Sequence, residues 1–149
     1  MKSQNFMKLS FPSKSVNEGF ARSAVAAFCT QLDPTVEQIN DIKTAVSEAV
    51  TNCIVHGYRD TFGIIYITAT INENTLTVKI ADKGVGIEDV NRAMQPMFTT
   101  DEAGERAGIG FAVMQSFMDT LKVKSTLGKG TRVVMTKKIK PRDTDVIAT

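Results

Sequence analysis

Apolar residues recur at helical spacing in two neighbouring segments near the start of the chain. Ser15 and Glu18 have the spacing of a capping box, which predicts a helix whose apolar face consists of Val16, Phe20, Ala24, Ala27, Phe28 and Leu32. Thr35 and Gln38 repeat the capping signal. A second helix is expected to run from there to Gly57, because glycine is typical of helix ends.

Alternating apolar and polar residues predict strands, two pairs of which flank turns. Asn72-Glu73-Asn74 has the residues of a hairpin turn, and so does Leu127-Gly128-Lys129-Gly130. A shorter strand is expected before the first helix. The predicted strands are Lys8–Phe11, Ile64–Ile71, Leu76–Ala81, Leu121–Thr126 and Thr131–Lys137.

The segment between Gly84 and Arg106 is the least regular part of the chain. A short helix is expected at Glu88–Met94, followed by Pro96, paired threonines and acidic residues with a glycine, a composition typical of a mobile loop. We expect this loop to form a lid at about residues 94–108. A third long helix is predicted from about Ile109 to Asp119.

The order helix, helix, hairpin, loop, helix, hairpin indicates an α+β fold. We expect a two-layer α/β sandwich with the helices on one face of a mixed, mostly antiparallel sheet. The 149 residues are expected to form one domain, residues 1–149, with a polar and frayed tail at about 140–149. Strands and helices do not alternate as a doubly wound parallel sheet would require.

Composition and charge narrow the classes of function. The net charge of +2 is too small to indicate direct binding of nucleic acid or an anionic membrane. No apolar run approaches the ~20 residues of a membrane-spanning helix, and the first residues lack the apolar core of a signal peptide. We therefore expect a cytoplasmic protein, in which Cys29 and Cys53 are reduced thiols and not a disulfide.

Glu48 and Asn52 are the first candidates for chemistry. They are i,i+4 neighbours on the second helix, so both side chains can reach one ligand. They lie beside the expected core stripe of that helix, and the small Ala45 and Ala49 leave room next to Asn52. An amide oxygen suits Mg²⁺, and a carboxylate there can activate a hydroxyl. Taken alone, the pair is more typical of a solvated helix face.

Asp82 closes a predicted strand and begins a glycine-rich turn. Its carboxylate can accept a hydrogen bond from an exocyclic amine such as that of adenine, and Gly84 and Gly86 allow a flat base to approach. Alone, this sequence favours an ordinary tight turn. His56 is a further candidate as a phosphoacceptor, although its position before Gly57 favours an interaction with the helix end.

A second glycine pair, Gly108 and Gly110, precedes the third predicted helix. The free N–H groups of a helix N-terminus bind anions, so phosphates are expected there. Arg106, just before the pair, can contact a terminal phosphate or an acidic partner. Gly128-Lys129-Gly130-Thr131 lacks the full spacing of a P-loop. It is interpreted as a hairpin turn with Thr131 at the floor of a base pocket.

Together these motifs resemble the gyrase, histidine kinase and MutL superfamily of ATPases, which share the Bergerat ATP-binding fold. Glu48 and Asn52 match its N box, Asp82-x-Gly84-x-Gly86 its first glycine box, and Gly108-x-Gly110 its second. Nearly the whole chain is similar to the sporulation anti-sigma kinases of this superfamily. That closer match rests on the segments Ser47–Asn52, His56-Gly57-Tyr58, Phe98-Thr99-Thr100 and Glu105–Phe111.

The resemblance implies an anti-sigma factor that is also an ATP-dependent serine protein kinase. It would bind a sporulation sigma factor of the sigma F type and block formation of the RNA polymerase holoenzyme. It would also phosphorylate, and thereby inactivate, an anti-anti-sigma protein on a serine. A homodimer is implied as well, with partners docking on an exposed surface that Glu18 and Arg22 fit.

Residue by residue, the resemblance makes Glu48 the catalytic base and Asn52 the ligand of Mg²⁺. Arg106 would act at the lid, near the γ-phosphate and the incoming partner. The remaining residues implied in binding ATP are Asp82, Gly84, Gly86, Thr99, Thr100, Gly108, Ile109, Gly110 and Thr131.

Three alternatives stay open at this point. A general-stress anti-sigma kinase would share the chemistry and differ in its sigma partner. A non-catalytic module would use ATP only to order its lid, and Glu48 argues against it because a pure binder needs no base there. A histidine-kinase fragment lacks support, because no helix bearing a phosphoacceptor histidine precedes the domain.

Overall fold

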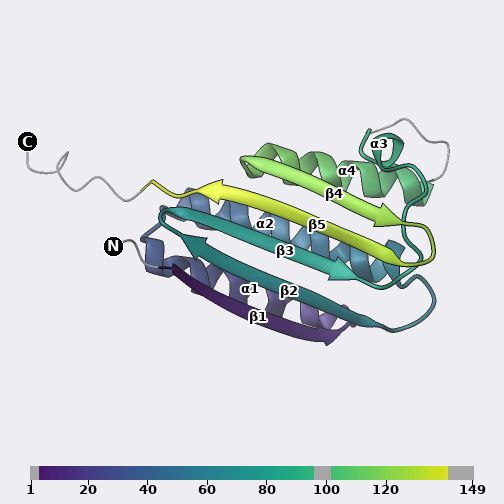
Figure 1. Cartoon of the computed structure of the whole chain (residues 1–149), viewed down its shortest axis with the longest axis horizontal. Helices are drawn as coiled ribbons and strands as arrows, with labels where there is room; N and C mark the ends of the chain where they lie inside the picture. The colour runs from purple at the N-terminus through teal and green to yellow at the C-terminus, as the bar shows by residue number, and fades with distance from the viewer. Residues whose placement is uncertain (1–3, 96–101, 141–149) are drawn as a thin grey trace, which may run out of the picture.

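Five strands form one sheet in the order β1-β2-β3-β5-β4 in the computed structural model (Figure 1). The structure describes residues 4–95 and 102–140, and it describes their side chains except those of residues 102–107. All four pairings are antiparallel, so the expectation of a mixed sheet was wrong in that detail. The strands are β1 (Gln4–Pro12), β2 (Ile64–Asn72), β3 (Thr75–Asp82), β4 (Thr120–Thr126) and β5 (Gly130–Lys138).

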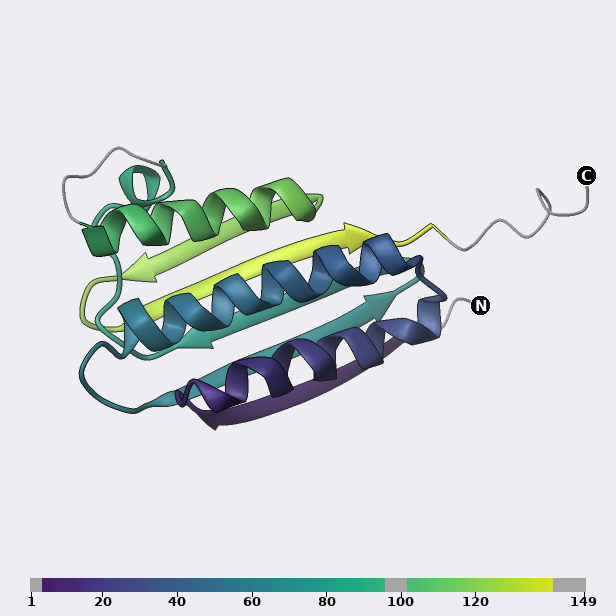
Figure 2. The same ribbon diagram turned by 180° about the vertical axis from the view of Figure 1, so that it is seen from behind.

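Three long helices cover one face of this sheet (Figure 2). They are α1 (Val16–Cys29), α2 (Val36–Asn52) and α4 (Glu102–Phe117). Shorter turns join them: η1 (Thr30–Leu32), the π-helical turn η2 (Cys53–Gly57) and α3 (Val90–Ala93). The α+β class and the two-layer sandwich are confirmed. Among the described residues, no helix is long and apolar enough to span a membrane.

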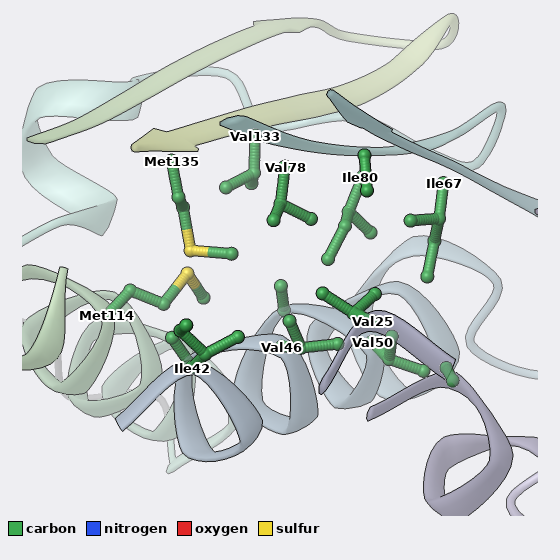
Figure 3. Close-up of a cluster of buried hydrophobic side chains, with 14 of the residues drawn as sticks. Val25, Ile42, Val46, Val50, Ile67, Val78, Ile80, Met114, Val133 and Met135 are labelled. Carbon is green, nitrogen blue, oxygen red and sulfur yellow. The ribbon is translucent and has the colours of Figure 1, made fainter. Parts of the chain in front are cut away.

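The core lies between α2 and the middle of the sheet. Alternate residues of β2 and β3 are buried, as the period of a strand requires. In Figure 3 the sheet residues Val78 and Ile80 point toward α2, and Met114 of α4 meets Met135 of β5. Burial of each apolar side chain of this size contributes about 1.5–3 kcal/mol. This packing fixes how α2 lies on the sheet.

The two predicted capping boxes have different outcomes. At α2 the box is present, since Thr35 Oγ1 accepts from Gln38 N (3.1 Å) and Gln38 Oε1 accepts from Thr35 N (2.9 Å). At α1 it is absent, because Ser15 has helical backbone angles and its hydroxyl makes no cap. Glu18 instead accepts hydrogen bonds from Arg22 (2.9 Å) and Ser47.

The predicted apolar face of α1 was only partly right, because Phe28 and Leu32 pack against the core but the residues at its start do not. Val16 and Phe20 are 78% and 54% exposed, and the buried residues are Ala21, Val25, Ala26 and Cys29. This face carries smaller side chains, which let α1 pack closely on α2 and the sheet. Both cysteines are free and buried, as expected.

Element boundaries depart from the prediction at three places. β1 begins at Gln4, four residues before the predicted start, and α3 spans only Val90–Ala93. α4 begins at Glu102, well before Ile109. The hairpin strands and both turns are confirmed to within two residues. The tail beyond residue 140 and the middle of the predicted lid lie outside the described residues.

The face of the sheet opposite the helices is open and basic. Figure 1 views the molecule from this side. Within the described strands the only acidic residue is Asp82, and its side chain is buried on the other side. The open basic face, as we call it, carries the exposed side chains of Lys8, Lys79, Lys83, Lys122, Lys124, Arg132 and Lys138.

Candidate functional site

A cavity of about 450 Å³ lies where η2, the end of β3 and the start of β5 meet. This volume is within the usual range for small-molecule sites. Four of the residues expected to bind ATP or Mg²⁺ line it: Asn52, Asp82, Gly86 and Thr131. Other lining residues were not predicted as site residues and come together only through the fold; these include Arg59, Ile87, Arg92, Phe111, Leu127 and Val133.

Asp82 is the most constrained side chain at this cavity. Its residue is 7% exposed, and its carboxylate accepts hydrogen bonds from Gly84 N (2.9 Å), from the Cys53 thiol and from the Thr131 backbone N–H. Burial raises the pKa of Asp82 above its ordinary value, and the three hydrogen bonds oppose this shift. A carboxylate has about four lone-pair positions. One lone-pair position of the Asp82 carboxylate therefore remains for a donor in the cavity.

The backbone after Asp82 approaches the end of η2 very closely. A Cβ on Gly57 would lie 2.8 Å from the Asp82 Oδ2, and a Cβ on Gly84 would overlap the Gly57 carbonyl. Gly84 therefore packs against Gly57 and is not among the residues that line the cavity, and its role in binding a base stays a prediction. Gly86 does line the cavity, with a φ of 75° that favours glycine.

Two hydrogen bonds tie the glycine turn to the residues that follow α2. Lys83 N donates to the Tyr58 hydroxyl (2.7 Å), which itself donates to Ile64 O (2.6 Å). Val85 N donates to Gly57 O (2.9 Å). The turn is thus held in place before any ligand binds.

Glu48 and Asn52 lie next to Gly110 of α4. A Cβ built on Gly110 would be 3.2 Å from the Glu48 Oε2 and 3.2 Å from the Asn52 Oδ1. The structure therefore brings the first and third sequence motifs together, and only a glycine leaves the space between them open. Glu48 is beside the cavity, while Asn52 lines it.

Asn52 has the environment of a ligand-binding amide. Within the described part of the chain, its side-chain nitrogen is buried and has no hydrogen-bond partner. Buried polar atoms are nearly always paired, so this nitrogen needs an acceptor from outside the described residues. No group of three or more His, Cys, Asp and Glu side chains that could hold a metal occurs among the described residues.

The start of the third helix expected at Gly108 and Gly110 was wrong, while their role in binding phosphate stays a prediction. Gly108 and Gly110 lie inside α4, because the residues from Glu102 onward already continue the helix. Ile109 is 48% exposed and does not line the cavity. Thr99, Thr100 and the side chain of Arg106 lie outside the described residues.

The remaining candidates lie near the site or on α1. His56 lines the cavity from η2. Glu18 and Arg22 form an ion pair (2.9 Å) on α1, and Glu18 also accepts from Ser47 of α2. Glu18 therefore links two helices, and the role of this pair in partner binding stays a prediction.

Comparison with known proteins assigns the family. Residues 11–137 match the family described as histidine kinase-like ATPase domain. The chain is 63% identical over 139 residues to the anti-sigma F factor of Thermoanaerobacter sp. (strain X514), covering 93% of this chain and 97% of that protein. The chain belongs to the anti-sigma F factors of the histidine kinase-like ATPase family. As in other ATPase domains, ATP is the nucleotide this family implies.

Other anti-sigma F factors are also similar, and a solved structure shares the fold. The anti-sigma F factor of Clostridium acetobutylicum is 52% identical over 135 residues, covering 91% of this chain and 94% of that protein. The crystal structure of the RsbU and RsbW domains of a Mycobacterium tuberculosis protein matches with a TM-score of 0.65 at 16% identity. That match covers 91% of this anti-sigma F factor and 32% of the other chain. The likeness confirms the fold.

Proposed function

We propose that this anti-sigma F factor withholds a sporulation sigma factor from RNA polymerase and is also an ATP-dependent serine kinase. Its kinase substrate is an anti-anti-sigma protein, which is inactivated by the phosphorylation. The observation that carries the kinase activity is the meeting of Glu48 and Asn52 with Gly110 beside a cavity of about 450 Å³. A protein that only bound ATP would need no carboxylate at this place.

The cavity has a base end and a phosphate end in this proposal. Asp82 and Thr131 lie at the base end and bind adenine, and Gly86 lets the ring approach the turn. Asn52, with Gly110 beside it, marks the phosphate end. Gly108 and the lid residues Thr99, Thr100 and Arg106 remain candidates for contacts with phosphate on sequence grounds.

Asn52 is the residue that would hold Mg²⁺. Its unpaired buried nitrogen is a donor that suits a phosphate oxygen of the nucleotide, and its amide oxygen suits a hard cation. The bound ion would neutralise charge on the phosphates of ATP.

Glu48 is the proposed base. It takes the proton of the partner's serine hydroxyl while the serine oxygen bonds to the γ-phosphorus and the bond to the bridging oxygen of ADP breaks. The Glu48 Oε2 and the two amide atoms of Asn52 are the three atoms nearest to a Cβ built on Gly110. Arg106 is proposed to stabilise the charge that develops on the phosphoryl group.

The partners are proposed to bind a homodimer and to sense its nucleotide. Glu18 and Arg22 are candidates for the docking surface, and the exposed Val16 and Phe20 lie on the same helix. In this proposal each partner binds the two nucleotide states with different affinities. Each bound partner must then change the affinity for the nucleotide by the same factor.

Glu48→Gln tests the kinase mechanism. We expect it to reduce phosphate transfer to the anti-anti-sigma serine by at least a hundredfold, while the affinity for Mg-ATP changes less than threefold. Glu37→Gln, on the exposed first turn of the same helix, is the matched control and should transfer phosphate normally. Transfer is measured with labelled ATP and binding by calorimetry. Normal transfer by Glu48→Gln would refute the mechanism, and tight ATP binding without transfer by the wild type would favour a non-catalytic module.

A further inference from the structure

Ser125 of β4 connects two walls of the cavity without lining it. Its Oγ accepts a hydrogen bond from Ile87 N (2.7 Å), lies 2.8 Å from the Thr131 Oγ1, and donates to Gly130 O (2.9 Å). Ile87 and Thr131 both line the cavity. Ser125 and Thr131 are directly opposite each other in the β4–β5 ladder. One hydroxyl therefore joins the glycine turn to the base end of the site.

The single proton of Ser125 determines the orientation of the Thr131 hydroxyl. A serine hydroxyl has one donor and two acceptor positions. Since a carbonyl can only accept, the contact with Gly130 O uses the Ser125 proton. Thr131 must then donate its own proton to Ser125. The hydroxyl of Thr131 is left with acceptor positions only.

The base end of the cavity consequently presents acceptors. The Asp82 carboxylate and the Thr131 hydroxyl oxygen are both without a proton to offer, and the Thr131 N–H is already bonded to Asp82. An exocyclic amine carries two N–H donors and matches such a pair. A purine with a carbonyl at C6 has an acceptor there, and its only added donor is the neighbouring N1–H, so an acceptor that faces C6 would be left unpaired.

We propose that Ser125 is a positioning residue that makes this anti-sigma F factor select purine nucleotides with an amine, rather than a carbonyl, at C6. It acts through Thr131 and through Ile87, and it does not itself touch the nucleotide. The inference rests on the proposed binding of adenine at Asp82 and Thr131, and it adds the residue that sets the selectivity.

The test compares Mg-ATP with Mg-ITP by calorimetry on the full chain. The two bases differ at C6, which carries an amine or a carbonyl, and at N1, which carries a proton only in ITP. We expect wild type to prefer ATP. Ser125→Ala frees the Thr131 proton to rotate and donate, so the ATP-over-ITP preference should fall about tenfold, the value of one ordinary hydrogen bond. Ser125→Thr keeps the hydroxyl and should restore the preference.

Two further variants separate this role from a structural one. Thr120→Ala breaks a similar hydroxyl pair, Thr120 with Thr136 (2.6 Å), at the far end of the same two strands and should leave the preference unchanged. Thr131→Val removes the acceptor itself and should reduce the preference even if Ser125→Ala folds poorly.

Equal weakening of ATP and ITP by Ser125→Ala would overturn the inference. A wild type that binds ATP selectively but transfers no phosphate would refute the kinase and not this inference.

Discussion

Cys53 lines the cavity next to Asp82 and shares a hydrogen bond with it. Burial, followed by the charge of Asp82, raises the pKa of the Cys53 thiol well above its ordinary value. The thiol is therefore protonated at neutral pH and acts as a donor to the carboxylate. Nothing in the spacing of the two cysteines along the sequence pointed to this contact.

Cys53→Ala is predicted to weaken ATP binding severalfold. The change removes one of the three donors that hold the Asp82 carboxylate, a loss of about 1 kcal/mol. Titration calorimetry with Mg-ATP measures the effect.

Cys29→Ala is the matched control, because Cys29 is also a buried, free thiol but lies on α1 away from the cavity. It leaves a void of the same size, so its affinity for ATP should equal that of the wild type. Equal losses in the two variants would mean that general loosening of the core, and not the hydrogen bond to Asp82, weakens binding.

At the scale of elements, the N-terminal caps of α1 and α2 differ although their sequences are alike. Thr35 caps α2 through its side chain, whereas Ser15 at the start of α1 makes no cap. Both positions have the same sequence signal. The backbone of Ser15 is already helical, and Glu18 is engaged by Arg22 and Ser47.

Thr35→Ala should lower the free energy of unfolding by about 1 kcal/mol, the usual cost of losing an N-cap. Ser15→Ala should change it by less than about 0.5 kcal/mol, as for surface substitutions without a specific contact. Urea unfolding followed by circular dichroism gives both values. A cost for Ser15→Ala as large as that for Thr35→Ala would contradict the assignment of a cap to α2 alone.

The strands and α2 were predictable because their signals are local. Alternation in β2 and β3 and the periodic residues of α2 are set by which face meets the core. The same local signals failed for α1, where close packing on α2 selected the small residues Ala21 and Ala26 over Val16 and Phe20. They also failed for the start of α4, since glycines suggested a boundary inside a continuous helix.

In the site, motif spacing located Asn52, Asp82, Gly86 and Thr131, and the structure places all four on one cavity. The supporting contacts could not be predicted, because they join segments far apart in the chain. Ser125 with Ile87 and Tyr58 with Lys83 are examples. Such pairs arise from strand register and from where a turn happens to pass, and no short motif encodes either.

At the scale of the whole molecule, charge is distributed unevenly. The open basic face concentrates cations in a protein whose net charge is only +2. Lys79 lies near its middle, in a cross-strand row that includes Lys8 on β1 and Lys122 on β4. Neighbouring cations in this row lie two strands apart, so the strand spacing of ~4.8 Å separates them by about 10 Å.

Lys79→Gln is predicted to stabilise the protein by a few tenths of a kcal/mol at low salt, because it removes repulsion within this row. The gain should vanish above about 0.5 M NaCl, since the Debye length falls from about 30 Å at 0.01 M to a few ångströms. Unfolding in urea at several salt concentrations measures it. Lys14→Gln, an exposed lysine in the loop before α1, is the control and should show no such dependence. A gain that persisted unchanged in high salt would exclude electrostatic repulsion as its cause.

The close contact between Gly57 and the Asp82 turn restricts how this end of the molecule can vary. No side chain fits at Gly57 or Gly84 without displacing the carboxylate or the backbone, whereas Gly128 faces open space. Single substitutions at the first two positions should therefore be eliminated from any library selected for ATP binding, while Gly128 tolerates replacement better, limited by its φ of 82°. Homologous chains can change the turn beneath the nucleotide only by altering η2 and the residues after β3 together.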